Sequence, residues 1–191
     1  MALFDLSDPT VSLPSQLVVD TSLLLALRPA DDNPHAAAAR AFVRRLGERI
    51  AAYELVAWLP LPVLQECYHI VLANGLRRIW ERMDRATRPP NWLKTYKDQP
   101  ELLESCQPEL TRFRELLAAI PLTPVRPADL AASPTAEPLA ERMQHFITAH
   151  HLLPQDALIL AQAERLEVWA VATLDLDWRR ASGFDVYTCP A

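Results

Sequence analysis

Short apolar runs that stop abruptly at polar residues are the clearest pattern along this chain. Leu17-Val18-Val19, for example, is followed at once by Asp20. A continuous apolar run of this length is typical of a strand that is buried on both faces of a parallel sheet. The predicted strands are Leu17–Asp20, Val56–Leu59, Ile120–Val125, Val168–Thr173 and Asp185–Thr188. Pro121 and Pro124 weaken the third prediction, because proline cannot donate to a sheet ladder.

Between these runs, capping residues and helix-forming residues predict helices. The predicted helices are His35–Glu54, Pro62 to Asn74-Gly75, Leu76–Ala86, Pro108–Ala118, Glu137–His150 and Pro154–Leu166. Gly75 is expected to end the second helix, because glycine commonly follows the last helical residue. Arg88 to Pro100, with its prolines and Trp92, is expected to be a connection without regular structure.

Alternating strands and helices predict an α/β fold with three layers, in which helices cover both faces of a central parallel sheet. We expect an N-terminal extension at residues 1–16 and a single domain at residues 17–191. Extra helices, at about residues 75–118, are inserted after the second strand.

The composition of the chain excludes several classes of protein function. The chain has 17 prolines but only three glycines, so the glycine-rich loops of P-loop and dinucleotide-binding enzymes are excluded. No apolar run approaches the roughly 18 residues that span a bilayer, and we expect no secretory signal. The cysteines (Cys67, Cys106 and Cys189) are odd in number and form no CxxC pair, which favours reduced thiols and a cytoplasmic protein.

Four acids stand at the edges of apolar segments: Asp20, Glu66, Asp156 and Asp175. Asp20 ends a buried strand, and a buried carboxylate costs several kcal/mol unless it is paired or binds a cation. The others have ordinary alternatives: Asp156 can cap a helix, Asp175 can sit in a turn, and Glu66 can reach the surface.

The predicted topology brings these acids together. The carboxyl ends of parallel strands share one edge of the sheet, and α/β proteins bind ligands there. A shared divalent cation would compensate all four charges. Oxygen ligands without a matching Cys and His set favour Mg²⁺ or Mn²⁺ over zinc.

These residues resemble the PIN-domain nucleases, which include the VapC-like ribonuclease toxins. The matching blocks are Val18-Val19-Asp20-Thr21-Ser22, Val63-Leu64-Gln65-Glu66, Pro154-Gln155-Asp156-Ala157-Leu158 and Ala172-Thr173-Leu174-Asp175-Leu176-Asp177-Trp178. They follow the family's order, and Gly183 to Thr188 looks like its last strand.

The resemblance implies a PIN-like fold and metal-dependent RNA hydrolysis. It makes Asp20, Glu66, Asp156 and Asp175 the metal ligands and catalytic residues. The hydroxyl groups of Ser22 and Thr173 would support these ligands. Asp177 would be a further supporting acid. Toxin-type relatives commonly form homodimers and are inhibited by a small antitoxin protein, so both are expected partners beside the RNA substrate.

The distribution of charge suggests where RNA binds. The net charge is −5, but residues 77–97 contain seven Lys and Arg against two acids. Arg77, Arg78, Arg82 and Arg85 are therefore candidate phosphate ligands. The alternative is a solvated helix face.

Other functions match less well. A haloacid-dehalogenase-type phosphatase needs a second acid two residues after the first, where this chain has Ser22. A response-regulator receiver needs an acidic pair and a late lysine, and neither is convincing here. His145, His150 and His151 are expected to be a solvated helix end. A catalytically inactive PIN-like module for RNA binding or scaffolding remains the alternative of a different class.

Overall fold

The computed structural model describes residues 2–29, 33–131 and 137–189. The chain divides into two compact units. Residues 1–64 and 120–191 form the first, here called the sheet unit, and residues 65–119 form the second, called the helical unit. The helical insertion predicted at about residues 75–118 falls inside the helical unit, which begins ten residues earlier. The sequence also predicts that Asp31 and Asp32 help to cap the helix at His35–Glu54, but these two acids lie outside the described residues.

The sheet unit is built on one parallel sheet, which among the described residues has six strands in the order β1-β6-β5-β2-β3-β4. The strands are β1 (Leu3–Asp5), β2 (Gln16–Val19), β3 (Val56–Leu59), β4 (Thr123–Pro124), β5 (Ala170–Ala172) and β6 (Asp185–Thr188). The five strands predicted from the apolar runs are thus confirmed, and β4 is the shortened edge strand that its prolines indicated.

β1 was not predicted. Its three residues lie within the expected N-terminal extension and pair in parallel with β6 at the sheet edge. Phe4 stacks on Tyr187 with ring centroids 4.8 Å apart. The segment is too short to show a strand pattern by itself, so its pairing depends on the partner strand.

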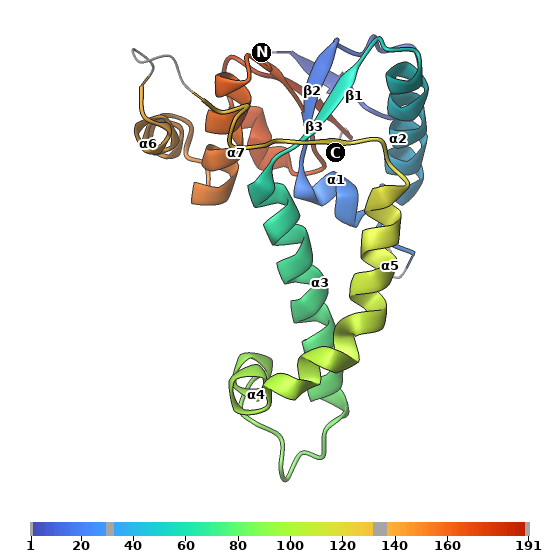
Figure 1. Cartoon of the computed structure of the whole chain (residues 1–191), viewed down its shortest axis with the longest axis vertical. Helices are drawn as coiled ribbons and strands as arrows, with labels where there is room; N and C mark the ends of the chain where they lie inside the picture. The colour runs from blue at the N-terminus through green and yellow to red at the C-terminus, as the bar shows by residue number, and fades with distance from the viewer. Residues whose placement is uncertain (1, 30–32, 132–136, 190–191) are drawn as a thin grey trace. The chain divides into compact units, whose positions relative to one another are not determined.

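The helices of the sheet unit cover both faces of the sheet, which confirms the three-layer α/β/α architecture. They are α1 (Thr21–Leu25), α2 (Ala36–Ala51), α6 (Leu139–His150) and α7 (Pro154–Arg165). Figure 1 shows α2 on one side of the sheet and α7, with α6 packed against it, on the other. Leu17, Val18 and Val19 of β2 are at most 1% exposed, because β2 is a central strand with helices on both sides.

The helical unit contains most of α3 (Leu61–Arg82), then α4 (Trp92–Asp98), the 3₁₀ helix η1 (Pro100–Cys106) and α5 (Gln107–Ala118). Tyr68 of α3 meets Phe113 of α5 edge to face, with ring centroids 5.6 Å apart. Arg78 forms an ion pair with Glu109 across the same two helices. These contacts hold α3 and α5 together as a helical pair.

Two predictions about the helical unit are wrong. Gly75 does not end a helix, because α3 continues to Arg82. A Cβ atom at Gly75 would lie 2.8 Å from the Cys106 sulfur, so glycine here permits close approach of two segments. Arg88 to Pro100 is not irregular either. It contains α4, whose cap Asn91 accepts a hydrogen bond from the Lys94 amide at 2.8 Å.

Among the described residues, no helix is long and apolar enough to cross a membrane.

Candidate active site

Asp20 occupies the carboxyl end of β2 and caps the N-terminus of α1. Only 3% of the residue is exposed. One carboxylate oxygen, Oδ2, accepts hydrogen bonds from the Ser22 hydroxyl at 2.7 Å, the Thr173 hydroxyl at 2.8 Å and the Ser22 amide at 3.3 Å. A strand–acid–helix sequence produces this geometry, because a side chain that ends a buried strand can accept from the first amides of the following helix.

Burial raises the pKa of Asp20 above its usual range, because it disfavours the charged form. Hydrogen bonds from Ser22 and Thr173 act in the opposite direction, but burial has the larger effect. Among the described groups that shift this pKa, none is a Lys, Arg or His side chain. Among the described residues, the groups that shift the pKa of Asp20 are thus hydroxyl and amide donors, and burial outweighs them.

The topology brings the end of β5 beside Asp20. β2 pairs with β5 through Val19 and Ala172, and the Asp20 amide donates to the Ala172 carbonyl at 2.9 Å. β3 and β4 lie on one side of β2, while β5 and β6 lie on the other. The strand order therefore reverses between β2 and β5, which is where open α/β sheets bind their ligands.

Two hydroxyl groups connect the two strand ends. The hydroxyls of Ser22 and Thr173 are 3.0 Å apart. Ser22 accepts from the Leu174 amide at 2.8 Å, and Thr173 accepts from the Asp175 amide at 3.0 Å. Thr173 is completely buried. Asp20, Ser22, Thr173 and Asp175 thus belong to one hydrogen-bonded cluster, here called the strand-end cluster.

Asp175 lies at the exposed side of this cluster. It caps the 3₁₀ helix η2 (Leu176–Arg180) and accepts from the Asp177 amide at 2.9 Å. The Asp177 side chain is exposed and forms an ion pair with Arg180 at 2.9 Å. Asp175 is therefore the more accessible acid of the cluster, whereas Asp20 is enclosed.

Asp156 belongs to the first turn of α7 in the same unit and is half-buried. α7 runs back to the start of β5, so its N-terminus faces the carboxyl edge of the sheet. Its neighbour Gln155 fixes this placement, because Gln155 Nε2 donates to the Pro62 carbonyl, just after β3, at 2.8 Å. The sequence does not indicate this role of Gln155, because no local pattern specifies so distant an acceptor.

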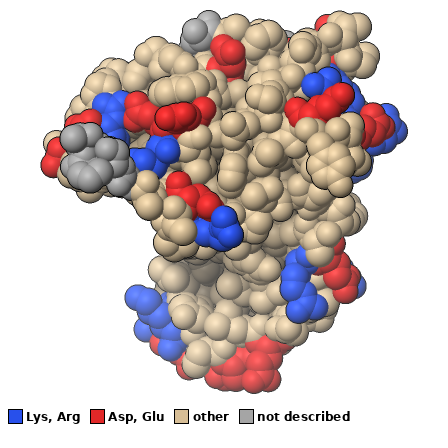
Figure 2. All heavy atoms as spheres, turned by 45° about the horizontal axis from the view of Figure 1, so that its top comes forward, with Lys and Arg blue, Asp and Glu red and all other residues tan. Residues whose placement is uncertain are grey.

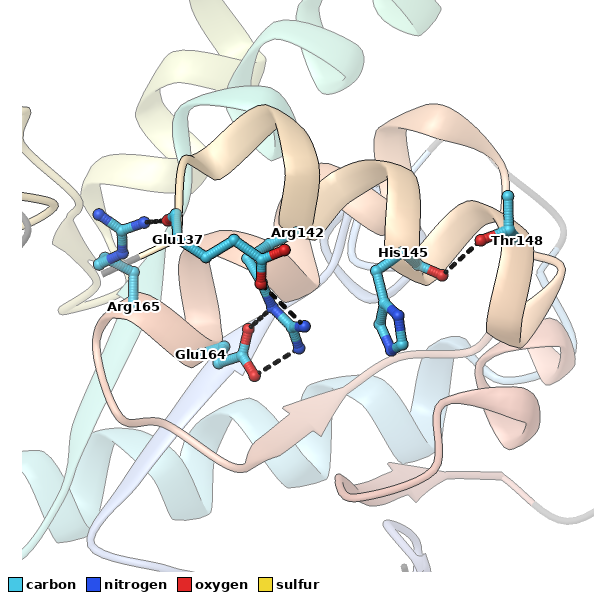
Figure 3. Close-up of polar contacts among 6 residues, drawn as sticks. All are labelled: Glu137, Arg142, His145, Thr148, Glu164 and Arg165. Carbon is cyan, nitrogen blue, oxygen red and sulfur yellow. Dashed lines mark hydrogen bonds and ion pairs between the residues drawn. The ribbon is translucent and has the colours of Figure 1, made fainter. Parts of the chain in front are cut away.

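α7 is also held from its other end. Arg142 of α6 lies between two acids and binds Glu164 of α7 through two hydrogen bonds of 2.6 and 2.7 Å (Figure 3). It contacts Glu137 at 3.3 Å, and Arg165 of α7 donates to the Glu137 carbonyl. These charge-assisted bonds between helices hold α6 against α7.

Glu66 lies in the helical unit, on α3, and is half-buried. The neighbouring Val63 and Cys67 are completely buried. The hydrogen bonds of the strand-end cluster therefore join the Asp20 carboxylate and the Asp175 backbone amide to the two predicted hydroxyls, Ser22 and Thr173. In the part of the chain that the structure describes, no three His, Cys, Asp or Glu side chains form a group that could hold a metal ion.

The strand-end cluster nevertheless suits a hard divalent cation. Its donors are carboxylate and hydroxyl oxygens, which are the ligand types that Mg²⁺ and Mn²⁺ prefer. Its central carboxylate is enclosed, and burial is the largest influence on its pKa. A bound cation would compensate the charge that burial disfavours.

The candidate RNA-binding arginines differ in their surroundings. Arg77, Arg82 and Arg85 are exposed, whereas Arg78 is half-buried and paired with Glu109. On the face drawn in Figure 2, basic side chains are separated by acidic ones and do not merge into one patch. A single broad basic surface is therefore not visible from that side.

The predicted histidine cluster is a helix end. His150 belongs to the last turn of α6, and its Nδ1 lies 2.9 Å from the Arg180 carbonyl. Its ring is 5.8 Å from that of His145. Both act in local packing and hydrogen bonding.

Comparison with known proteins identifies the fold family. The family model of the PIN domain matches residues 17–183, which is most of the chain. This chain belongs to the PIN-domain family. PIN domains are generally nucleases that act on nucleic acids and typically use divalent metals. The match begins at β2 and ends just before β6, so the strand-end cluster of this PIN domain lies within it. No curated protein matches the chain significantly.

Proposed function

We propose that this PIN domain is an endoribonuclease that hydrolyses RNA phosphodiester bonds with Mg²⁺ or Mn²⁺. The observation that carries the proposal is the placement of Asp20. It is a buried carboxylate with raised pKa, fixed by two hydroxyls at the point where strand order reverses.

In this proposal Asp20, Glu66, Asp156 and Asp175 are the catalytic metal ligands. Ser22 and Thr173 orient the Asp20 carboxylate, because both hydroxyls donate to the same oxygen. Asp177 supports Asp175 through its backbone amide. The role of Glu66 rests on its match to the family's second block. A divalent cation would supply the positive charge that stabilises the phosphodiester as negative charge develops during hydrolysis.

The proposed partners follow from the resemblance to PIN-domain nucleases and from the exposed arginines. RNA is the substrate, and Arg77, Arg82 and Arg85 are exposed on the helical unit to contact its phosphates. Arg78 would contribute less, because Glu109 neutralises it. A homodimer and a small inhibitory antitoxin follow from the likeness to toxin-type relatives.

A second function is favoured by one observation. The described acids do not assemble a group of three around a common point. If they fail to do so in solution, the chain is an inactive PIN domain that binds RNA or serves as a scaffold.

Incubation of the purified chain with labelled single-stranded RNA separates the two functions. We expect cleavage with Mg²⁺ or Mn²⁺ and none with EDTA. Asp20→Asn and Asp156→Asn should each slow cleavage by about 100-fold or more, which corresponds to about 2.7 kcal/mol of lost transition-state stabilisation.

The matched control is Asp129→Asn, because Asp129 makes its bonds with Arg126, within the same short turn. It should cleave at the wild-type rate. RNA that stays intact with either metal would support the scaffold, and equal cleavage with EDTA would exclude metal dependence.

A further inference from the structure

The helical unit contains an open apolar pocket that has no role in the proposed chemistry. Its volume is about 190 Å³. One wall comes from His69, Leu72 and Leu76 of α3, and the other from Trp92, Leu93 and Tyr96 of α4. Leu93 is 46% exposed and Tyr96 is 38% exposed. Apolar and aromatic surface is thus left open to solvent.

Local sequence explains why the pocket exists. His69, Leu72 and Leu76 follow one another at helical spacing and share a face of α3. Asn91 caps α4 and fixes its start, and Thr95 is completely buried. Trp92 and Tyr96 are four residues apart, so their rings project from the same face of α4 and line the pocket together.

Cationic residues adjoin the lining residues in the sequence. Arg77 directly follows Leu76, while Lys94 and Lys97 flank the lining residues of α4, and all three are exposed. Lys94 reaches Asp98 at 3.6 Å, an exposed contact that contributes little. The helical unit has nine Lys and Arg against eight acids, whereas the rest of the chain has ten against sixteen. A small aromatic cavity with exposed cations next to its lining residues in the sequence suits a ligand that joins a flat ring to negative charge.

The size and shape of the pocket distinguish among ligands of that kind. Its volume is below the roughly 300–1,000 Å³ of pockets for drug-sized ligands, so a single ring system fits better than a larger molecule. A partner helix would need a row of apolar sites along an extended groove. An unpaired base stacks on aromatic side chains irrespective of its identity, and its two phosphates can reach nearby cations.

We propose that this pocket binds one unpaired base of the RNA, with Arg77 and Lys97 contacting the phosphates on either side of it. The proposal rests on RNA being the ligand of the proposed function. Because paired bases cannot enter, the pocket would make the helical unit select unpaired segments of the substrate.

The test uses the full chain in EDTA, so that binding is measured without cleavage. The probe is a short fluorescent single-stranded RNA, and the readout is fluorescence anisotropy. Tyr96→Ala and Leu93→Ala should each weaken binding by about tenfold. Tyr96→Phe should bind as the wild type does, because it keeps the ring. Tyr53→Ala is the control, since Tyr53 is 97% exposed in the sheet unit.

An abasic strand of the same length separates stacking from charge. Wild type should bind it more weakly than the base-containing strand, and Tyr96→Ala should not weaken it further. The proposal is overturned if folded Tyr96→Ala binds RNA normally, if it loses affinity equally for both strands, or if wild type binds neither. It is also overturned if Tyr96→Ala converts a dimer to a monomer, because the pocket would then be an interface between copies.

Cleavage with Mn²⁺, measured on the same variants, keeps the two proposals apart. Tyr96-dependent binding without any cleavage by wild type would remove the ribonuclease proposal alone. Metal-dependent cleavage with normal binding by Tyr96→Ala would remove the base pocket alone.

Discussion

Burial of Asp20 has a consequence for stability that can be measured without substrate. Its pKa is raised mainly by burial, so the folded protein binds this proton more tightly than the unfolded chain does. Without metal, the contribution of this group to stability is therefore most favourable below the ordinary pKa of Asp. It is lost progressively as the pH rises through the folded pKa.

Asp20→Asn should remove this loss, because asparagine stays neutral. In EDTA near pH 7 we expect the variant to be more stable than wild type, by about 1.4 kcal/mol for each unit by which the pKa is raised. The difference should vanish at about pH 3, where wild-type Asp20 is protonated. Urea unfolding across this pH range measures it.

Asp129→Asn is again the control, because the pKa of Asp129 is shifted in the opposite direction to that of Asp20. A hydrogen bond from the Arg126 side chain lowers the Asp129 pKa, so its stabilisation is present above the unfolded pKa and is lost in acid. A variant Asp20→Asn that is less stable than wild type near pH 7 would contradict the account of this buried charge.

The residue pattern predicted that Asp20 and Asp175 follow strands that end at the same edge of the sheet, and the resemblance added Ser22 and Thr173. In the structure the two hydroxyls join these strand ends by hydrogen bonds. Other contacts could not be predicted. The bond from Gln155 to the Pro62 carbonyl spans 93 residues, and no local pattern specifies such an acceptor. The pairing of Arg78 with Glu109 could not be predicted either, because the sequence does not distinguish a paired arginine from an exposed one.

At the scale of elements, the ends of the strands predicted from apolar runs lie within three residues of the observed ends. A glycine taken as a helix stop was misleading. Gly75 looked like a helix end because its sequence context is that of a cap. Its structural reason is the nearby Cys106, a tertiary contact outside the helix. β1 was missed because three residues carry too little pattern.

Two glycine substitutions test this interpretation. Gly75→Ala should destabilise the protein by about 1–3 kcal/mol, because a Cβ atom there would collide with the Cys106 sulfur. Gly47→Ala, in the C-terminal part of α2, should stabilise it by about 0.5–1 kcal/mol, since a Cβ atom there meets nothing within 4 Å.

Urea unfolding compares both variants, and adding Cys106→Ala should rescue Gly75→Ala. If Gly75→Ala stabilises the protein as Gly47→Ala does, close approach is not the reason for glycine at this position.

At the scale of the whole molecule, charge is divided between the two units. The sheet unit has an excess of acids, and the helical unit is nearly balanced with exposed arginines along α3 and just beyond it. Three of the four proposed metal ligands, Asp20, Asp156 and Asp175, belong to the acidic sheet unit, whereas Glu66 and the candidate phosphate contacts belong to the helical unit.

Replacing Arg77, Arg82 and Arg85 with alanine should weaken RNA binding by a similar factor for all sequences. It should also reduce the slope of log affinity against log salt by about 2, which is the value for three lost phosphate contacts on a single strand. Anisotropy titrations at several salt concentrations measure both. The control replaces Arg49 and Arg126, which are paired with Glu54 and Asp129 in the sheet unit. An unchanged slope in the triple variant would show that these arginines do not contact phosphates and only face solvent.

The central claim is that acids from four separate segments share one divalent-ion site. Calorimetric titration of the metal-free chain with Mn²⁺ tests it most directly. Asp20→Asn, Glu66→Gln, Asp156→Asn and Asp175→Asn should each weaken binding by about tenfold or more, while Asp129→Asn binds as wild type does. Wild-type chain that takes up no Mn²⁺, or four variants that all bind it normally, would contradict the claim.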